Sequence, residues 1–240
     1  MILVAVAGVG TGGYGFWTLM SYRMVSVPSG GMSPTIQPGA VVLYRWTPLP
    51  EIPRGAVVLM DLSAFPDSAP GDGRIVKRVI GTGGDQVVCC TPDNLITVNG
   101  KPVKEPYTDD ENGYGRKEYM PFTVQVPPGA VFVAGDQRNN SRDSRIYVGM
   151  PGDGAVPLSK VHGVVVGRGS TLGAEPFPQT TAFVEAGLPG DPVSDTGFRS
   201  SRNLAFAGAG LVVLGVIGAI VTVVRSAGKR RRAAAIPPAH

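Results

Sequence analysis

Two long uncharged segments constrain this sequence more than any other feature. Neither the stretch from Leu204 to Val224 nor the stretch from Ile2 to Met20 contains a charged residue. Each reaches the length of about 20 apolar residues that crosses a bilayer. We therefore expect a membrane anchor at residues 1–22 and a second transmembrane helix at residues 204–224.

Basic residues predict how these segments are oriented. The tail at residues 225–240 contains Arg225, Lys229 and three consecutive arginines, whereas only Arg199 and Arg202 flank the other end of the second stretch. Because basic residues favour the cytoplasmic side, the tail is expected in the cytoplasm and the central segment outside. The net charge of +4 then reflects topology, and we predict no nucleic-acid partner.

The first stretch has an alternative interpretation as a cleavable signal peptide. It lacks the basic segment that begins such peptides, and the first motif of interest follows within a few residues. We therefore favour an uncleaved anchor.

The central segment is typical of a turn-rich β structure. The sequence contains 34 Gly and 22 Pro, and many of them punctuate short runs rich in Val and Ile. We predict an all-β domain at residues 25–168, followed by a flexible linker at residues 169–203. The predicted strands are residues 40–44, 56–61, 74–80, 86–89, 95–98, 101–103, 122–126, 130–134 and 161–167.

Cysteine and histidine are scarce. The two cysteines, Cys89 and Cys90, are adjacent, which leaves open a strained vicinal disulfide, two reduced thiols, or, as we favour, two small strand residues without a function. The only histidines are His162 and His240, and no metal-ligand spacing is present. A Ser-His-Asp triad and a zinc site are therefore not expected, and no cofactor is predicted.

Two segments suggest chemistry without histidine. Residues 27–36, Val-Pro-Ser-Gly-Gly-Met-Ser-Pro-Thr-Ile, follow the first apolar stretch and would by themselves be only a turn. Residues 74–85 place Lys77 and Arg78 inside an apolar strand, where alternation predicts that one of the two faces the core. Desolvation lowers the pKa of a lysine and makes it a possible general base, although an edge-strand lysine whose amine reaches water is the simpler interpretation.

A third segment, residues 135–145, is crowded with hydrogen-bonding side chains. It lacks the terminal Glu of a calcium loop, and a solvated turn is the simplest alternative. Beside a lysine, its serine and aspartate would orient the amine, while its arginines would pair with Asp136 or Asp143.

In this order behind an apolar anchor, the three segments resemble the conserved boxes of type I signal peptidases. These are membrane-bound Ser/Lys endopeptidases that remove signal peptides from exported proteins. The resemblance covers residues 1–168, and a second, C-terminal anchor is similar to the arrangement in some actinobacterial members. It implies a β fold shared with self-cleaving repressors, an extracytoplasmic domain in the cell membrane, and signal peptides and membrane lipid as partners.

The resemblance also implies a role for particular residues. Lys77 matches the general base, and Ser29 matches the serine whose hydroxyl helps to bind the oxyanion. The residues that match supporting positions are Ser141, Asp143, Asp136, Arg138 and Arg145. Those expected to line pockets for small substrate residues are Pro28, Met32, Ile36 and Val76. Gln137 departs mildly from the family, which often has Asn there.

The sequence departs from the family at the nucleophile. The family's first box reads Pro-Ser-Gly-Ser-Met-x-Pro-Thr, and Gly31 stands where its second serine is expected. Losing the nucleophile of a serine hydrolase reduces turnover about a millionfold. Ser33 could replace it only if the register shifted by two residues, and Ser29 is needed for the oxyanion. The chain is then an inactive paralogue that binds signal peptides or a catalytic paralogue, an engineered inactive variant, or an enzyme that uses another serine.

Three other classes of function bear on this sequence. A binding module fits the sequence well, because only the nucleophile is missing. A self-cleaving repressor would need a helix-turn-helix for DNA, whereas this chain has two apolar spans. A purely structural membrane protein gives no reason for Lys77, Ser141 and Asp143 to occur in these motifs.

Overall fold

The computed structural model describes residues 2–46, 52–108, 121–170, 173–193, 195 and 197–234. The chain divides into two compact units, one of residues 1–21 with 196–240 and one of residues 22–195. The helices, in chain order, are α1 (Ile2–Leu19), η1 (Leu62–Ala64), η2 (Ser144–Tyr147), η3 (Leu158–Lys160), α2 (Ala182–Glu185) and α3 (Gly197–Ala234). The strands are β1 (Tyr22–Val27), β2 (Ala40–Arg45), β3 (Val57–Asp61), β4 (Arg74–Thr82), β5 (Gln86–Cys89), β6 (Thr97–Val98), β7 (Lys101–Pro102), β8 (Phe122–Gln125), β9 (Ala130–Ala134), β10 (Val156–Pro157), β11 (Val161–Arg168) and β12 (Glu175–Pro176).

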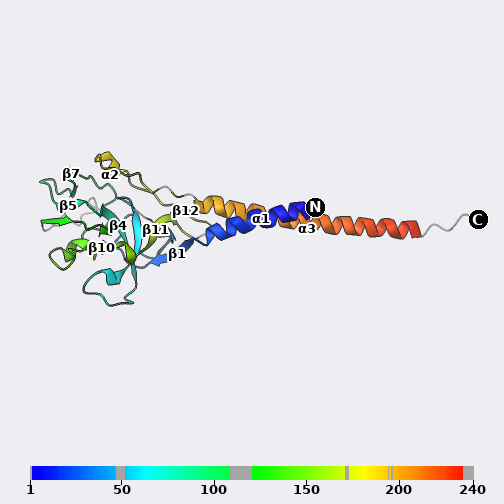
Figure 1. Cartoon of the computed structure of the whole chain (residues 1–240), viewed down its shortest axis with the longest axis horizontal. Helices are drawn as coiled ribbons and strands as arrows, with labels where there is room; N and C mark the ends of the chain where they lie inside the picture. Colours follow the sequence, from blue (N-terminus) through cyan, green and yellow to red (C-terminus); the bar gives the residue numbers. More distant parts are fainter. Residues whose placement is uncertain are drawn as a thin grey trace, which may run out of the picture. The chain divides into compact units, whose positions relative to one another are not determined.

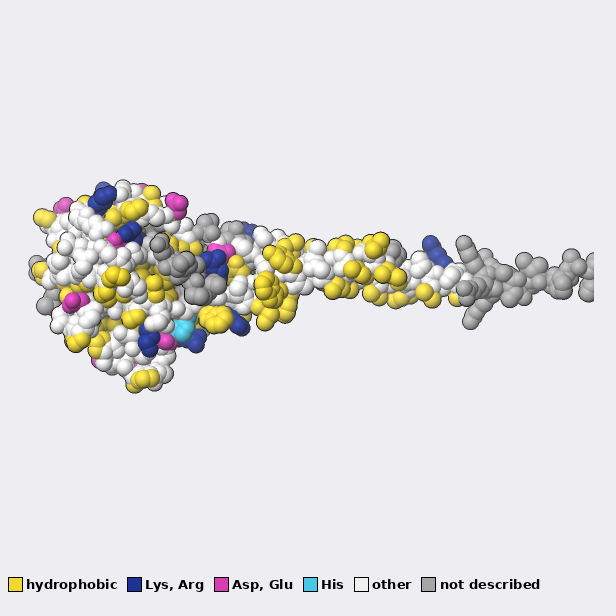
Figure 2. Space-filling model, in the orientation of Figure 1, with side chains coloured by type: hydrophobic (Ala, Val, Ile, Leu, Met, Phe, Trp, Pro, Cys, Tyr) yellow, Lys and Arg dark blue, Asp and Glu magenta, His cyan; other side chains and the backbone are white. Residues whose placement is uncertain are grey.

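The first unit consists of α1 and α3, which pack side by side (Figure 1). Small residues allow this approach, since a Cβ added to Gly208 would lie 2.2 Å from the backbone nitrogen of Gly12. The surface of both helices is largely hydrophobic (Figure 2). Both helices are long and apolar enough to cross a membrane. The second helix begins at Gly197, ahead of the predicted start at Leu204.

The second unit is built from two antiparallel sheets, which confirms the predicted fold class. The larger sheet has the order β1-β2-β11-β3-β4-β9-β10, with β12 paired to β11, and the smaller has the order β7-β6-β5-β8. Every predicted strand is present, with ends that agree within two residues. The strands β1, β10 and β12 were not predicted; β10 and β12 are each two residues long and carry no alternating pattern.

Strand β4 is covered on both faces. Residues 76–81 are all buried, and both Lys77 and Arg78 are included, with exposed fractions of 4% and 1%. The sequence predicted that one of these two side chains faces the core. The structure buries both, because loops from distant parts of the chain cover each face of the strand.

Part of the predicted flexible linker at residues 169–203 is packed. Phe177 is buried in the core cluster that contains Val57 and Val76, and Phe183 and Leu188 are buried in the cluster that contains Phe132. The prediction of a flexible linker is therefore wrong for this stretch. Its scattered apolar residues have no strand or helix period, yet they are buried in the core of the β unit.

The adjacent Cys89 and Cys90, whose state the sequence left open, are joined in a disulfide at the end of β5.

Candidate active site

Three separate parts of the β unit meet around Lys77. Strand β4 carries the lysine, the loop after β1 carries Ser29 and Gly31, and the loop after β9 carries Ser141. All four line one cavity of about 280 Å³. The three segments predicted to converge therefore do so.

Gly31 lies directly beside the lysine amine. A Cβ added to Gly31 would lie 3.2 Å from Nζ of Lys77, 3.3 Å from the carbonyl oxygen of Asn140 and 3.7 Å from Oγ of Ser141. A side chain that begins at this position would be in contact with both the amine and the hydroxyl.

A second glycine allows the loops to approach each other. The backbone N–H of Gln137 donates to the carbonyl of Gly31 at 3.2 Å. A Cβ on the neighbouring Gly135 would lie only 2.3 Å from that carbonyl oxygen and 2.1 Å from Oγ of Ser141. Only glycine at position 135 permits this packing, and so the end of β9 fixes the position of Gly31.

The electrostatics of the site favour a neutral amine. Burial lowers the pKa of Lys77, and the positive charge of Arg145 lowers it further, while the negative charges of Asp143 and Asp136 oppose this. Among the described residues Lys77 forms no ion pair within 4 Å, so no close carboxylate compensates for its burial. A lysine in such a position can act as a general base.

Asp143 is fixed in its charged form. Burial alone would raise its pKa, but Arg145, whose Nε donates to Oδ1 at 2.8 Å, holds the pKa below its usual range. The backbone N–H of Gly135 also donates to Oδ2 at 2.8 Å. The Asp143 carboxylate thus ties its loop to the end of β9, beside Lys77.

A further layer holds this loop from behind. Arg78 donates two hydrogen bonds to Asp136, from Nε to Oδ1 at 2.8 Å and from Nη2 to Oδ2 at 2.6 Å. The guanidinium of Arg78 also lies 4.0 Å from the centre of the Tyr107 ring. Arg138 pairs with Glu105, which in turn accepts a hydrogen bond from the Tyr107 hydroxyl at 2.7 Å. Within the described part of the chain, no group of His, Cys, Asp or Glu is arranged to hold a metal ion.

Comparison with known proteins places the chain in a family. Residues 1–168 match the family described as signal peptidase, peptidase S26. The chain belongs to this family. The match spans the first apolar helix and all three segments that meet around Lys77.

The relatives of this signal peptidase family member include curated bacterial enzymes. It is 35% identical to signal peptidase I of Mycobacterium tuberculosis over 147 residues, which cover 53% of this chain and 50% of that protein. It is 30% identical to signal peptidase I U of Bacillus subtilis over 143 residues, or 56% and 71% of the two chains. The chain therefore spans about half the length of the first curated relatives that it matches. A crystal structure of a signal peptidase I from Enterococcus faecalis aligns with 48% of this chain and 97% of its own, at 27% identity and a TM-score of 0.38.

The structure places the remaining predicted residues in three different environments. Asp136, Arg138 and Arg145 lie behind the cavity and hold its loops, and Pro28 is exposed beside Ser29. Met32, Ile36 and Val76 are all buried in one core cluster and do not line the cavity that contains Lys77. Their role in substrate binding stays a prediction.

Sequence reasoning missed several residues of the site. The cavity is also lined by Leu62, Ile75, Asn140 and Arg142. The position of Ile75 follows from strand alternation, because it lies two residues before Lys77. Leu62 has no such signal, since it begins the short helix η1 far from the motifs in the sequence.

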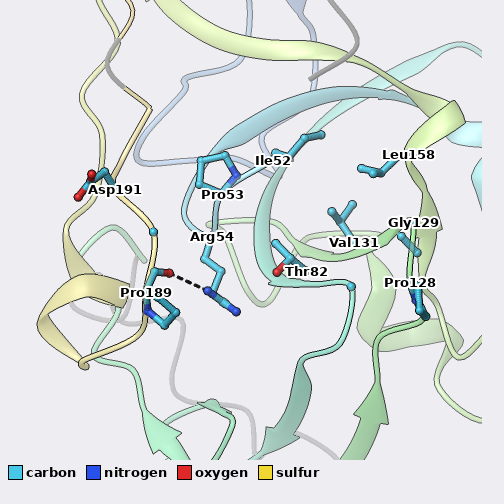
Figure 3. A pocket seen from close by; sticks show the side chains of 13 residues that line it. Ile52, Pro53, Arg54, Thr82, Pro128, Gly129, Val131, Leu158, Pro189 and Asp191 are labelled. Carbon is cyan, nitrogen blue, oxygen red and sulfur yellow. Dashed lines mark hydrogen bonds between the residues drawn. The ribbon is translucent and has the colours of Figure 1, made fainter. Parts of the chain in front are cut away.

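A second cavity of about 690 Å³ lies elsewhere in the β unit (Figure 3). It shares no residue with the Lys77 cavity, and six of its thirteen lining residues are glycine or proline. Its arginine, Arg54, is bound to Asp85 through two hydrogen bonds of 2.7 and 2.5 Å and donates to the carbonyl of Pro189 at 2.8 Å. The arginine thus serves to connect three segments of the chain.

Proposed function

We propose that this protein recognises the signal-peptide region of exported preproteins, and that Gly31 has removed the nucleophile for covalent serine catalysis. Binding is retained in this proposal, whereas cleavage is very slow or absent. The family relationship supports the class of ligand, and the geometry around Gly31 supports the change in chemistry.

One observation carries the proposal. A side chain at position 31 would begin 3.2 Å from Nζ of Lys77. A serine there would place its hydroxyl within reach of the amine, which is the relation that a nucleophile and its general base require. Glycine has no atom to attack the substrate, although the amine, Ser29 and Ser141 all line the cavity.

The binding surface does not depend on the missing hydroxyl. In the strand order of the described residues β1 is terminal, and it leads directly into the loop that contains Ser29 and Gly31. An extended peptide can add to such an edge through backbone hydrogen bonds. The substrate carbonyl would then lie against the loop whether or not a nucleophile is present.

The test compares the full-length protein with its Gly31→Ser variant in detergent micelles. Both should bind a fluorescent signal peptide with affinities within about threefold, because one hydroxyl at the base of the cleft adds little ground-state binding. The variant should cleave the peptide at least about a thousandfold faster, since restoring the nucleophile restores most of the lost turnover. Equal cleavage rates would contradict the proposal.

Two control variants locate the effect. Gly31→Ala adds the Cβ without a hydroxyl and should stay inactive. Gly30→Ser adds a hydroxyl one residue away, where a Cβ would lie near Gln137 and Pro38 instead of Lys77, and should also stay inactive. In the unmodified protein, Ser33→Ala should leave any residual cleavage unchanged. A loss of cleavage in Ser33→Ala would show that Ser33 is the nucleophile.

We further propose that both apolar helices span the membrane and that the β unit lies outside. The basic residues after α3 favour the cytoplasmic side for the tail, so the chain would cross outward through α1 and return through α3. A C-terminal epitope should be protected from protease in intact cells while the β unit is cleaved. Digestion of the epitope in intact cells would refute this orientation.

A further inference from the structure

The space beside Gly31 is surrounded by three polar groups of different character. A Cβ placed there would lie 3.2 Å from Nζ of Lys77, 3.3 Å from the carbonyl oxygen of Asn140 and 3.7 Å from Oγ of Ser141. A carbonyl accepts a hydrogen bond, a hydroxyl donates and accepts, and a neutral amine does both. Together they suit a small molecule that carries both a donor and an acceptor.

The hydroxyl of Ser141 keeps hydrogen-bonding capacity for a molecule in this space. Oγ of Ser141 is buried and makes no hydrogen bond of normal geometry among the described residues, although it lies close enough to Asp143 to help to lower the pKa of that carboxyl. A hydroxyl can donate one hydrogen bond and accept two, so Oγ of Ser141 can still bind a molecule in the recess. The same cavity contains Lys77 and extends to Leu62 and Arg142, which leaves room for a larger ligand beside the space at Gly31.

We propose that the recess at Gly31 binds a small protic nucleophile, such as water or hydroxylamine, and that Lys77 accepts its proton as it attacks the carbonyl of a bound peptide. This inference rests on the proposed function, because the peptide must occupy the adjacent cleft. The small molecule takes the place of the serine hydroxyl. Cleavage then proceeds by direct transfer of the acyl group to the small molecule, without an acyl-enzyme.

The reaction is balanced without any further reactant. With hydroxylamine, its nitrogen forms a bond to the acyl carbon and the scissile C–N bond breaks. The proton released by the nucleophile passes to Lys77 and then to the leaving amine. The products are a peptide hydroxamate and a peptide with a new amino terminus; with water, the first product is a carboxylic acid.

The chemistry of the amine supports this role. Burial lowers the pKa of Lys77, which increases the fraction of neutral amine available as a base near neutral pH. The space beside Gly31 also limits the size of the nucleophile that can bind. An alanine methyl group at position 31 would occupy the space in which the small nucleophile binds, at 3.2 Å from Nζ.

The experiment uses the full-length protein in detergent micelles with a saturating signal peptide and added hydroxylamine. Mass spectrometry measures peptide hydroxamate, and a reaction without protein gives the background. The unmodified protein should form hydroxamate at least about tenfold faster than Gly31→Ala, whose methyl group fills the recess. Lys77→Met should lower the rate about 100-fold, which is the lower end of the contribution of a general base.

A matched control distinguishes the loss of the general base from the loss of a positive charge elsewhere on the protein. Lys104 is an exposed lysine of the same unit, and Lys104→Met should form hydroxamate at the unmodified rate. Peptide affinity, measured for every variant by fluorescence anisotropy, shows whether each variant remains folded and able to bind.

The outcomes distinguish this inference from the proposed function. If the peptide binds to the unmodified protein but hydroxamate does not form above background, the recess does not hold a nucleophile and the inference is overturned. Equal rates in the unmodified protein and in a Gly31→Ala variant that binds peptide would overturn it as well. If the unmodified protein does not bind the peptide, the proposed function fails and this inference fails with it.

Discussion

The ion pair between Arg78 and Asp136 gives the sharpest test of how the site is held together. The two side chains are 1% and 0% exposed, and two hydrogen bonds connect them. Removing the charge from either partner leaves the other buried without compensation. We consider the single substitutions Asp136→Asn and Arg78→Met and the double variant that combines them.

The expected magnitude follows from these two bonds. Hydrogen bonds between charged groups contribute about 1.5–3 kcal/mol each, so the pair is expected to contribute about 3–6 kcal/mol. Breaking a buried ion pair by removing one partner typically destabilises a protein by about 3–5 kcal/mol, which agrees with this estimate. The double variant should lose clearly less than the sum of the two single losses, because no buried charge is left without a partner.

Thermal unfolding of the full-length protein in detergent micelles, followed by near-ultraviolet circular dichroism, measures the effect. For a unit of this size each kcal/mol corresponds to about 2–4 °C, so each single substitution should lower the Tm of the β unit by roughly 6–20 °C. Glu175→Gln and Arg74→Met are the controls, since both side chains are exposed.

Two results would refute the reasoning about this pair. The first is a change in Tm for Asp136→Asn as small as that of the exposed control Glu175→Gln. The second is additivity of the two single substitutions within about 0.5 kcal/mol, which would show that the two groups do not interact.

Three further predictions concern other contacts. Gly135→Ala should weaken signal-peptide binding at least about tenfold, because the added Cβ would lie 2.1 Å from Oγ of Ser141; unchanged affinity in fluorescence anisotropy would contradict this. Lys77→Met should raise the Tm at about pH 6, and this gain in Tm should become smaller towards about pH 10. The pKa of Lys77 is lower in the folded state, so the unfolded chain binds the proton more strongly. The charged lysine therefore destabilises the fold mainly at low pH, and this is the cost that the substitution removes. A gain in Tm that does not change with pH would indicate an effect of packing instead. Gly208→Val should separate α1 from α3, because a Cβ at Gly208 would lie 2.2 Å from the nitrogen of Gly12; cysteine cross-linking between the helices should decrease relative to Gly210→Val, which has open space.

Much of the fold was predictable because its signals are local. Turns such as Asn99-Gly100 separate short apolar runs, and the sequence alone therefore located the main strands. The convergence of Lys77 with Gly31 and Ser141 was predicted from the family resemblance. Strand periodicity by itself assigned faces within one strand but gave no information about which distant loop covers each face.

The missed features all depend on contacts between distant segments. Both Lys77 and Arg78 are buried because different loops cover the two faces of β4, which alternation within the strand cannot reveal. Glu105 and Tyr107 were not predicted as site residues, since they lie in a loop without a motif. Glu105 nevertheless binds Arg138, and the ring of Tyr107 lies against the guanidinium of Arg78. These contacts join residues more than 25 positions apart and leave no periodic pattern in the sequence.

The arrangement of ion pairs supports the proposal that the site keeps its shape without a serine at position 31. Asp143 with Arg145, and Asp136 with Arg78, fix the loop after β9 through backbone and charged groups, and Gln137 holds the carbonyl of Gly31. None of these contacts uses a side chain at position 31. A substitution at this position should therefore leave these contacts in place, although a Cβ there would lie 3.2 Å from Nζ of Lys77 and 3.3 Å from the carbonyl oxygen of Asn140, so that these neighbours must shift by a few tenths of an ångström. If the protein binds signal peptides as proposed, Gly31→Ser is therefore expected to alter cleavage while leaving binding largely intact.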